Sequence, residues 1–404
     1  MKPNNSNTKK VLMLVLSHYP SDPRVRREAE ALVNNGYRVD IVCMSSRNEL
    51  PEENFEGIRV FRILHGHTKE NILKYLLLTI RFFIKAAAKI NRLSRENEYS
   101  VIQIHNMPDY LVFTTIFQKL HGIPVILDLH DIMKELFKSR WNGGLQRFLL
   151  PFIGLTEKIS WAYADSLITT SYGFKQCLLD RGVKEEKITL ILNTADPHIF
   201  NKPKSDWSFK KGNPRFLYHG TVAERFGIHV AIEAIKKLKD KYPDIRFDIY
   251  GNYQIDYKEK LLALVQSSGL TANVFFHEYV SLEEISGIIH NTNFGLVPYV
   301  SDGFMDLALS TKTFEYVIMK LPVIASDIPS MRTIFNEKEI YYFKQNDPAH
   351  LADTLDDILS DGIHIKEKVA SAAEAYRHLS WSLMVKEYVK LIEKVSAKNE
   401  TVRA

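Results

Sequence analysis

Residues 302–327 read Asp-Gly-Phe-Met-Asp-Leu-Ala-Leu-Ser-Thr-Lys-Thr-Phe-Glu-Tyr-Val-Ile-Met-Lys-Leu-Pro-Val-Ile-Ala-Ser-Asp. A polar loop ending in Ser310 and Thr311 leads into a helical pattern that carries Lys312 and Glu315, and an apolar strand follows. The start of a helix presents free backbone N–H groups and a partial positive charge, which together favour a phosphate group. Lys312 adds a mobile cation, and Glu315 one turn later can accept hydrogen bonds from sugar hydroxyls. This stretch therefore predicts an α/β fold that binds a nucleotide diphosphate beyond the carboxyl ends of parallel strands.

The length of the chain and its charge limit the classes of protein it can be. A chain of 404 residues predicts two or three domains, and a net charge of +5 does not indicate a nucleic-acid partner. Cys43 and Cys177 stand far apart without metal-ligand spacing, which favours a reduced, cytoplasmic protein. Residues 1–10 lack the apolar core of a secretory signal, and no long uncharged apolar run predicts a membrane span.

Short β-rich runs alternate with helical patterns along the chain, which predicts two doubly wound parallel sheets. The first series of strands is expected at Val11–Ser17, Arg38–Met44, Ile58–Leu64, Val101–His105, Pro124–His130, Ser166–Ser171 and Ile188–Asn193. The second is expected at Phe216–Gly220, Arg246–Gly251, Val274–Tyr279, Phe294–Tyr299, Pro322–Ser326 and Ile340–Phe343. A polar linker with three prolines, Asp196–Arg215, separates the two series. We therefore expect an N-terminal domain over 1–198, a C-terminal domain over 199–380, and a helix over 381–404 that packs back on the first domain.

Several common binding motifs are absent from the sequence. It contains no Gly-x-Gly, no Gly-x-x-x-x-Gly-Lys, no Asp-x-Asp and no His-Glu-x-x-His. We therefore expect no dinucleotide cofactor, no P-loop and no bound metal. The charge of a diphosphate would then be met by Arg, Lys and backbone dipoles.

A second candidate for that role follows the first strand of the second series, in Tyr218-His-Gly-Thr-Val-Ala-Glu-Arg-Phe-Gly227. Gly220 lets the backbone approach a ligand, and Arg225 offers a bidentate grip on phosphate. The same residues also fit a tight strand-to-helix turn with a solvated arginine. Glu315, taken alone, equally fits a surface carboxylate paired with Lys312 one turn earlier.

At this point the sequence resembles a known family, the retaining nucleotide-sugar glycosyltransferases of the GT-B fold, family 4. The resemblance covers nearly the whole chain, and the common order and spacing of several short motifs carry it. In the first half they are Asp22-Pro-Arg-Val-Arg-Arg-Glu-Ala-Glu-Ala-Leu32, Gly36-Tyr-Arg-Val39, Asp128-Leu-His-Asp131 and Asn193-Thr-Ala-Asp196 with Phe200. In the second half they are Tyr218-His-Gly-Thr221, Glu224-Arg-Phe-Gly227, Val297-Pro-Tyr299, Thr311-Lys-Thr-Phe-Glu-Tyr316 and Pro322-Val-Ile-Ala-Ser326.

The resemblance implies a fold, an activity and a set of partners. The fold would be GT-B, with two Rossmann-like domains facing each other across a cleft. The activity would be metal-independent transfer of a sugar from a nucleotide diphosphate sugar to a glycan or lipid-linked acceptor, with retention of anomeric configuration. The nucleotide-sugar would be a substrate and not a cofactor, and the product would belong to cell-surface polysaccharide or glycoconjugate synthesis. A non-catalytic nucleotide-sugar-binding protein and a sugar-nucleotide epimerase of the same fold are the alternatives.

The resemblance also implies roles for individual residues. His130 would be the catalytic residue, beside the donor sugar, and Asp22, Arg24 and Asp131 would contact the acceptor. The donor site would comprise Gly220, Thr221, Arg225, Gly251, Tyr279, Asp306, Ser310, Thr311, Lys312 and Glu315.

Three of these implied roles have competing structural explanations. His130 also fits a histidine satisfied by a neighbouring backbone group. Asp131 either orients the His130 imidazole or caps the next helix, and we favour the cap. Arg24 follows Asp22-Pro23, which is equally a helix start with an N-cap and a proline at the first helical position.

The sequence departs from the family pattern at the phosphate and sugar contacts. Glu315 matches the second glutamate of the family's Glu-x7-Glu element, but position 307 is Leu, with Asp306 beside it. Thr221 and Phe226 stand where the family commonly has an arginine and a lysine. Arg225 and Lys312 are therefore expected to replace that pair.

A helix expected over Asn71–Arg95 suggests how the acceptor is approached. Its cations fall on one helical stripe, with apolar residues largely on the other side. The cations are Lys74, Arg81, Lys85, Lys89 and Arg92, and the apolar residues are Leu73, Leu76, Leu77, Ile80 and Ile84. Such a stripe fits an anionic membrane surface, a lipid-linked acceptor and a peripheral position at the inner face of the cell membrane. The alternative is an outer helix whose charged face is simply solvated.

Overall fold

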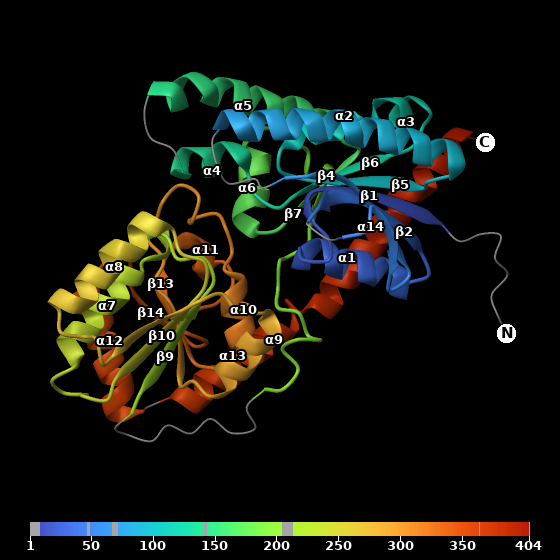
Figure 1. Ribbon diagram of the computed structural model, residues 1–404. Helices are drawn as coiled ribbons and strands as arrows, with labels where there is room; N and C mark the ends of the chain where they lie inside the picture. Colours follow the sequence, from blue (N-terminus) through green and yellow to red (C-terminus); the bar gives the residue numbers. More distant parts are fainter. Residues whose placement is uncertain are drawn as a thin grey trace. The chain divides into compact units, whose positions relative to one another are not determined.

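Two sheets, one parallel throughout and one parallel except at its β3 edge, each with helices on both faces, make up the computed structural model of the chain (Figure 1). The structure describes residues 9–46, 49–66, 72–140, 144–203, 213–362 and 364–403. Asn71 and residues 204–212 of the expected linker lie outside the described residues. The chain divides into two compact units, unit 1 with residues 1–192 and 384–404 and unit 2 with residues 193–383. The sequence predicted the corresponding domain boundaries at 198/199 and 380/381.

Unit 1 is built on an eight-stranded sheet with strand order β3-β4-β2-β1-β5-β6-β7-β8. The strands are β1 (Lys10–His18), β2 (Arg38–Ser45), β3 (Glu52–Phe55), β4 (Ile58–His65), β5 (Val101–His105), β6 (Val125–Leu129), β7 (Ser166–Thr169) and β8 (Ile188–Leu190). Every residue of β5 and β6 is buried, because helices cover both faces of the sheet and leave no water-facing side. That double burial explains why these strands appear in the sequence as continuous apolar runs.

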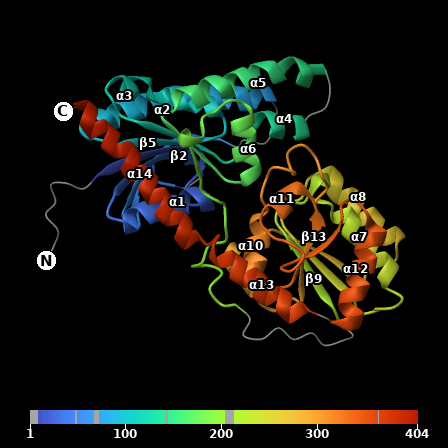
Figure 2. The same cartoon turned by 180° about the vertical axis from the view of Figure 1, so that it is seen from behind.

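The helices of unit 1 are α1 (Pro23–Asn34), α2 (Ile72–Glu96), α3 (Ile116–Leu120), α4 (Met133–Arg140), α5 (Gly144–Tyr163), α6 (Tyr172–Asp180) and α14 (Trp381–Arg403), with the short 3-10 helices η1 (Asp109–Thr115) and η2 (Glu185–Lys187). Helices α2, α3 and α5 form one layer over the sheet, and α1 and α14 lie on the opposite face (Figures 1 and 2). None of the helices in the described ranges is long and apolar enough to cross a membrane.

Strand β3 was not predicted from the sequence. It pairs antiparallel with β4 through a two-residue turn at Glu56 and Gly57, both with positive φ. That conformation is the one that tight hairpins require. The polar sequence Glu-Glu-Asn-Phe carries only a weak strand signal, so the hairpin depends on its pairing with β4.

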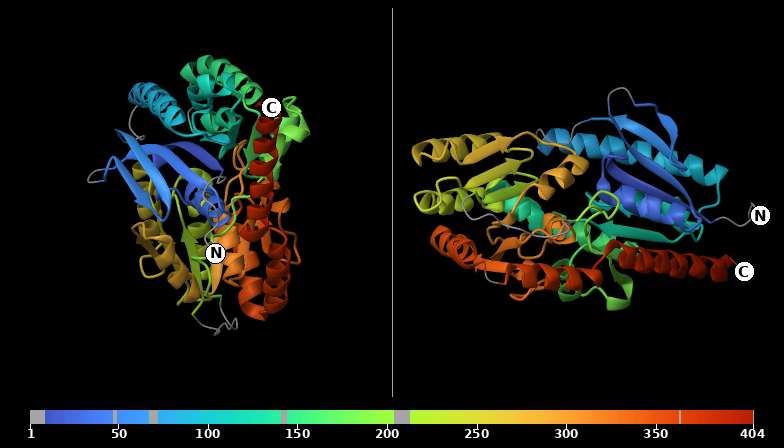
Figure 3. Two further views of the ribbon diagram at one scale, coloured as in Figure 1. Left: turned by 90° about the vertical axis from the view of Figure 1, so that its right-hand side faces the viewer. Right: turned by 90° about the horizontal axis from the view of Figure 1, so that it is seen from below.

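Unit 2 is built on a wholly parallel six-stranded sheet with strand order β11-β10-β9-β12-β13-β14. The strands are β9 (Arg215–His219), β10 (Arg246–Tyr250), β11 (Val274–His277), β12 (Phe294–Val297), β13 (Val323–Asp327) and β14 (Tyr341–Lys344). The helices are η3 (Glu224–Phe226), α7 (Ile228–Leu238), α8 (Ile255–Ser267), α9 (Leu282–His290), α10 (Thr311–Ile318), α11 (Pro329–Arg332), α12 (Pro348–Asp361) and α13 (Ile365–Arg377). Helices α7, α8 and α12 cover one face, and α9, α10 and α13 cover the other (Figures 1 and 3).

The predicted α/β fold with two doubly wound sheets is confirmed, and each predicted strand is present with shifts of a few residues. Strand order reverses between β1 and β5 in unit 1 and between β9 and β12 in unit 2. In open α/β sheets the crevice beyond the carboxyl ends of the strands at such a reversal is where ligands bind. Each unit therefore presents one candidate ligand site.

Candidate active site

Two histidines and an aspartate meet at the carboxyl ends of β5 and β6 in unit 1. His105 Nδ1 lies 3.0 Å from Asp128 Oδ2 and 3.1 Å from His130 Nε2, which is itself 3.2 Å from the same carboxylate oxygen. His105 and Asp128 are fully buried, whereas the His130 side chain is 21% exposed. His130 is thus the member of this cluster that a ligand can reach.

The backbone around His130 is fixed by its neighbours. Its N–H donates to Asn106 Oδ1 at 2.8 Å, and its C=O accepts from Thr170 Oγ1 at 3.1 Å. Burial by itself would lower the pKa of His130, but the Asp128 carboxylate outweighs burial and raises it. The imidazolium form, with its positive charge and hydrogen-bond donor at the end of β6, therefore persists to higher pH than in a free histidine.

The Arg24 side chain points into unit 1 and is nearly fully buried. Its guanidinium grips Asp128 with two hydrogen bonds of 3.1 and 2.9 Å, donates to the Ile191 carbonyl at 3.2 Å, and pairs with Glu28 at 3.0 Å. Burial alone would raise the pKa of Asp128, but Arg24 and His130 hold it well below its usual range. The structure therefore places Arg24 as an internal partner of Asp128, because its hydrogen bonds are already used within the unit.

The other two residues assigned to the acceptor lie on either side of this cluster. Asp22 caps α1, accepting from the backbone N–H groups of Arg24 and Val25 and from Ser17 Oγ at 2.9 Å. Burial would raise the pKa of Asp22, but the His130 charge and the Ser17 hydroxyl lower it. The Asp131 carbonyl accepts from Asn106 Nδ2 at 2.7 Å.

The same three side chains are the one group among the described residues with donor atoms close enough to hold a metal ion. These atoms of His105, Asp128 and His130 all lie within 4.8 Å of one another. Both oxygens of Asp128, however, already accept from the Arg24 guanidinium, whose positive charge opposes a second cation. The arrangement suits a charge network that orients His130.

In unit 2, Lys312 lies at the start of α10 inside a group of aromatic rings. Its Nζ hydrogen-bonds the Tyr299 hydroxyl and lies 4.8 Å from the Tyr218 ring centroid and 5.5 Å from that of Phe226. Tyr299 in turn donates to Ser310 Oγ at 3.1 Å. Cation–π contacts of this kind hold an ammonium group in place without neutralising it. The positive charge of Lys312 therefore remains available to an anion.

Gly220 and Gly251, both predicted to belong to the donor site, determine the backbone conformation beside Lys312. Gly220 follows β9 with a φ of +117°, and a Cβ there would lie 3.5 Å from Lys312 Nζ. Gly251 follows β10, and a Cβ on it would overlap the Gly220 carbonyl oxygen at 1.7 Å. Only glycine fits at position 251, because the neighbouring atom is rigid backbone. The two loops therefore approach each other closely at the predicted donor site.

Glu315 lies one helical turn after Lys312 and is buried. Its Oε2 is 3.1 Å from His219 Nε2, at the end of β9, but the two groups are not aligned for a hydrogen bond. Both atoms are buried without a hydrogen-bond partner among the described residues. A buried carboxylate oxygen left in this state costs free energy, so it favours an added donor such as a hydroxyl group.

The remaining predicted donor residues fall at different distances from this centre. Thr311 Oγ1 accepts from Asn193 Nδ2 at 3.1 Å, and the Thr221 carbonyl accepts from the Tyr218 hydroxyl, so both border the Lys312 group. Arg225, on η3, is held by its carbonyl bond to Val300 N–H at 2.9 Å, and its guanidinium lies 5.9 Å from the Phe304 ring centroid.

Asp306 and Tyr279 are not joined to the Lys312 group by any contact that the described residues show. Asp306 accepts from Ser301 Oγ at 2.8 Å, and burial raises its pKa. Tyr279 follows β11 at the far edge of the sheet and is mostly exposed.

Comparison with known proteins identifies the family of the chain. The family model described as Glycosyltransferase Family 4 matches residues 24–198, and the one described as Glycosyl transferases group 1 matches residues 200–378. The chain belongs to the GT-B glycosyltransferases of family 4. The family that the sequence resembled is thereby confirmed, and the chain is a glycosyltransferase.

Individual relatives of this glycosyltransferase are distant but aligned over most of their length. The D-inositol 3-phosphate glycosyltransferase of Pseudarthrobacter chlorophenolicus is 21% identical over 368 residues, covering 89% of this chain and 86% of the relative. The phosphatidyl-myo-inositol mannosyltransferase of Mycobacterium tuberculosis is 22% identical over 382 residues, 93% of each chain.

Solved structures show the same fold. Sucrose-phosphate synthase from Thermosynechococcus elongatus has a TM-score of 0.77 at 18% identity, covering 96% of this chain and 99% of that one. Anabaena HepE, solved with UDP and glucose, has a TM-score of 0.71 at 14% identity, covering 96% and 100%.

Sequence reasoning assigned no role to five residues of the candidate sites. His219 faces Glu315, and Tyr299 hydrogen-bonds Lys312. Asp128 binds Arg24, His105 contacts His130, and Glu28 pairs with Arg24. His219 and His105 each end a strand at the reversal of strand order, and that position was the available signal. Tyr299 and Glu28 lie in motifs quoted above, but no feature of those motifs predicts which residues they contact.

Proposed function

We propose that this glycosyltransferase moves a sugar from a nucleotide diphosphate sugar to a glycan or lipid-linked acceptor with retention of configuration. Its product would belong to cell-surface polysaccharide or glycoconjugate synthesis, made at the inner face of the membrane. HepE was solved with UDP and glucose, and the mycobacterial relative is named as a mannosyltransferase for phosphatidyl-myo-inositol. These names support a nucleotide-sugar donor and an acceptor that carries a lipid.

The buried Glu315 oxygen without a donor, one turn after the free charge of Lys312, is the observation that carries the proposal. Lys312 and Arg225 would neutralise the diphosphate, together with the N–H groups at the start of α10. Glu315 would accept hydrogen bonds from ribose hydroxyls. No metal would be needed, because these cations and backbone dipoles meet the diphosphate charge.

The reaction would proceed on the face of the sugar that the diphosphate leaves. The bond between the anomeric carbon and the phosphate oxygen breaks, and the acceptor oxygen forms the new bond on the same face. The departing phosphate oxygen takes the acceptor's proton, and no enzymic nucleophile is required. His130, favoured as imidazolium by Asp128, would position the donor sugar through its exposed edge. Stabilisation of the leaving diphosphate would lower the barrier most.

Calorimetric titration with UDP-, GDP- and dTDP-sugars tests the donor site. For the donor that binds, Glu315→Gln should weaken binding about 10- to 100-fold, because charged hydrogen bonds contribute about 1.5–3 kcal/mol. Lys312→Met should weaken the nucleoside diphosphate more than the free nucleoside, since the lost interaction is with phosphate. Glu283→Gln, on the exposed face of α9, is the matched control. Donor affinity unchanged in Glu315→Gln would contradict the assignment.

A non-catalytic binding protein is the second candidate, favoured by Leu307 and Thr221 at positions where the family has charged residues. Incubating the bound donor with membrane extract, and following the anomeric proton by NMR, separates the candidates. A glycoside of unchanged configuration supports retaining transfer. Tight donor binding without any product supports the non-catalytic protein, and an altered sugar nucleotide supports an epimerase.

A further inference from the structure

The outward face of α2 is apolar. Leu76, Leu77, Ile80 and Ile84 are exposed, Ile84 to 63%. The inner face is instead made by Phe82, Ala86, Ile90 and Leu93, which are buried against the unit. The four exposed residues are therefore not part of the core of unit 1. Only a partner outside the described residues could bury them.

The exposed cations of α2 lie directly beside this apolar strip. Arg81 comes directly after Ile80 in the sequence, and Lys85 directly after Ile84. Each cation is therefore rotated by about 100° around the helix axis from the apolar residue before it. Lys85 Nζ reaches the Ile63 carbonyl at 3.1 Å, which places the basic side toward β4. The outward half of α2 is thus an apolar strip bordered by Arg81 and Lys85. The other two cations further along the helix are ion-paired, Lys89 with Glu52 and Arg92 with Glu96.

Two neighbouring helices extend the apolar strip. On α5, Phe152, Leu155 and Ile159 fall at helical spacing and are each at least half exposed. On α3, Ile116, Phe117 and Leu120 are exposed, Leu120 to 78%. Helices α2, α3 and α5 lie on the same face of the sheet (Figures 1 and 2), where α2 contacts α3 and where η1 packs against both α2 and α5. Soluble proteins rarely leave so many large apolar side chains together on one layer unless they bind something there.

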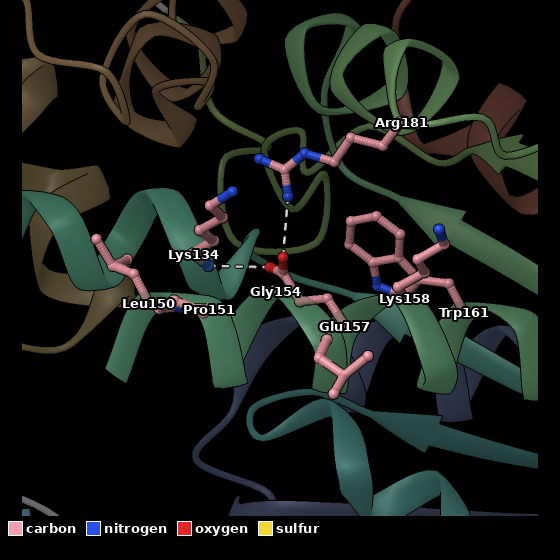
Figure 4. A pocket seen from close by; sticks show the side chains of 9 residues that line it. Lys134, Leu150, Pro151, Gly154, Glu157, Lys158, Trp161 and Arg181 are labelled. Carbon is pink, nitrogen blue, oxygen red and sulfur yellow. Dashed lines mark hydrogen bonds and ion pairs between the residues drawn. The ribbon is translucent and has the colours of Figure 1, made fainter. Parts of the chain in front are cut away.

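A pocket of about 480 Å³ opens beside the α5 strip (Figure 4). Its lining includes Lys134 of α4, Lys158 of α5, Arg181 after α6, and Leu155, which also belongs to the apolar strip. Position 154, one helical turn from Lys158, is glycine, and the Lys134 side chain lies over it, 3.7–3.9 Å from where a Cβ would be. These are ordinary van der Waals distances, so the Lys134 side chain packs directly over this part of α5.

The charge of this pocket is positive. Arg181 is neutralised, because its guanidinium binds Glu157 at 2.9 Å (Figure 4) and also binds Glu135. Among the described residues, the ammonium groups of Lys134 and Lys158 make no hydrogen bond or ion pair. Two unneutralised cations on the rim of a pocket suit a singly or doubly charged anion such as a phosphate group.

We propose that the layer formed by α2, α3 and α5 rests on a bilayer that contains anionic phospholipid, with a lipid phosphate group in the Lys134–Lys158 pocket. The apolar side chains would enter the region between headgroups and acyl chains, and the cations beside them would lie at the level of the phosphates. This border of cations favours lipid over an apolar protein partner, because a lipid surface supplies negative charge along its whole length. The inference rests on the proposed function only in that both expect the acceptor to be carried by a lipid.

Vesicle flotation tests the surface directly. The full chain should float with vesicles containing about one third phosphatidylglycerol and much less with pure phosphatidylcholine. Lys134→Gln with Lys158→Gln should weaken binding about 25-fold, from about five-fold for each cation at an anionic surface. Lys236→Gln with Lys237→Gln, exposed on α7, makes the same change in net charge and should leave binding unchanged.

The apolar strip is tested by Ile84→Gln with Phe152→Gln, which should reduce flotation even at low salt. Ile255→Gln with Leu262→Gln, also exposed but on α8, is its control. No flotation of the wild type, or equal loss in the control pairs, overturns the proposal, as does binding of glycerol 3-phosphate in the pocket without any binding of vesicles. Donor affinity is also measured in solution for every variant. Loss of vesicle binding with unchanged donor affinity then concerns the membrane surface alone, whereas a wrong donor site shows in the donor affinity.

Discussion

A single carboxylate, Asp128, organises the site in unit 1. It accepts two hydrogen bonds from Arg24 and lies within 3.2 Å of nitrogen atoms on both His105 and His130. Removing one partner from such a buried group leaves an uncompensated charge, which is strongly destabilising. His130 reaches solvent and Asp128 does not. Asp128 is therefore a positioning residue for His130.

The charge of His130 predicts how stability changes with pH. Because its pKa is raised in the folded protein, charged His130 stabilises the fold fully below about pH 6.5, the unfolded value. That contribution is lost as pH rises through the folded pKa. The difference in free energy of unfolding between wild type and His130→Gln should therefore be largest near pH 5.5 and shrink by pH 8.5, as measured by urea unfolding. His290→Gln, at an exposed helix end, is the control, and a difference that grows with pH would refute the prediction.

Some of this cluster is visible in the sequence and some is not. Asp128 and His130 are two residues apart at the end of a strand, so alternation places them on the same side of the sheet. His105 ends a different strand, and Arg24 lies 104 residues away from Asp128 in the chain. No local pattern links residues at such separations, because only the packing of α1 against the sheet brings them together.

At the scale of elements, α14 joins the end of the chain to the centre of unit 1. The buried Tyr388 hydroxyl donates to Gln103 Oε1 at 2.6 Å, and Gln103 Nε2 donates to Glu28 at 2.7 Å. Glu28 in turn pairs with Arg24. A residue near the C-terminus thus supports the same network as Asp128.

Tyr388→Phe should lower the free energy of unfolding by about 1–2 kcal/mol, because it leaves the buried Gln103 oxygen without a donor. Glu387→Gln, exposed on the same helix, should change it by less than about 0.5 kcal/mol. Urea denaturation of both variants at neutral pH measures the difference. Equal stability of Tyr388→Phe and wild type would show that the hydroxyl finds another partner or contributes nothing.

Helix α2 shows what element-scale patterns can and cannot predict. The sequence correctly indicated a long helix with a basic stripe, and the helix covers Ile72–Glu96. It placed the apolar residues largely opposite that stripe, whereas four of them share the exposed half of the helix with it. Apolar residues occur around most of α2, so periodicity alone does not define which of them face the sheet.

At the scale of the whole molecule, each unit has its own sheet and its own reversal of strand order. The Lys312–Glu315 site belongs wholly to unit 2, and the His130 cluster wholly to unit 1. A donor held by residues of unit 2 should therefore protect the backbone of that unit most strongly.

Hydrogen exchange followed by mass spectrometry tests this expectation. Saturating donor nucleotide should slow amide exchange most in residues 218–227 and 299–315, because these loops carry Gly220, Arg225 and the start of α10. Glu315→Gln at the same nucleotide concentration should lose most of the protection. Protection confined to residues 17–24 and 128–131 would instead move the nucleotide to unit 1.

The sequence by itself determined the alternation of strands and helices, the division into two doubly wound sheets, and the family. It also placed Lys312 and Glu315 one turn apart at a helix start, since all of these are local patterns of spacing and polarity. Only the tertiary structure decided that His219 faces Glu315, that Arg24 is buried on Asp128, and that the apolar strip of α2 faces outward. These facts depend on contacts between distant segments, whose orientation is set by how the helices pack on the sheets and is not encoded in any single stretch of chain.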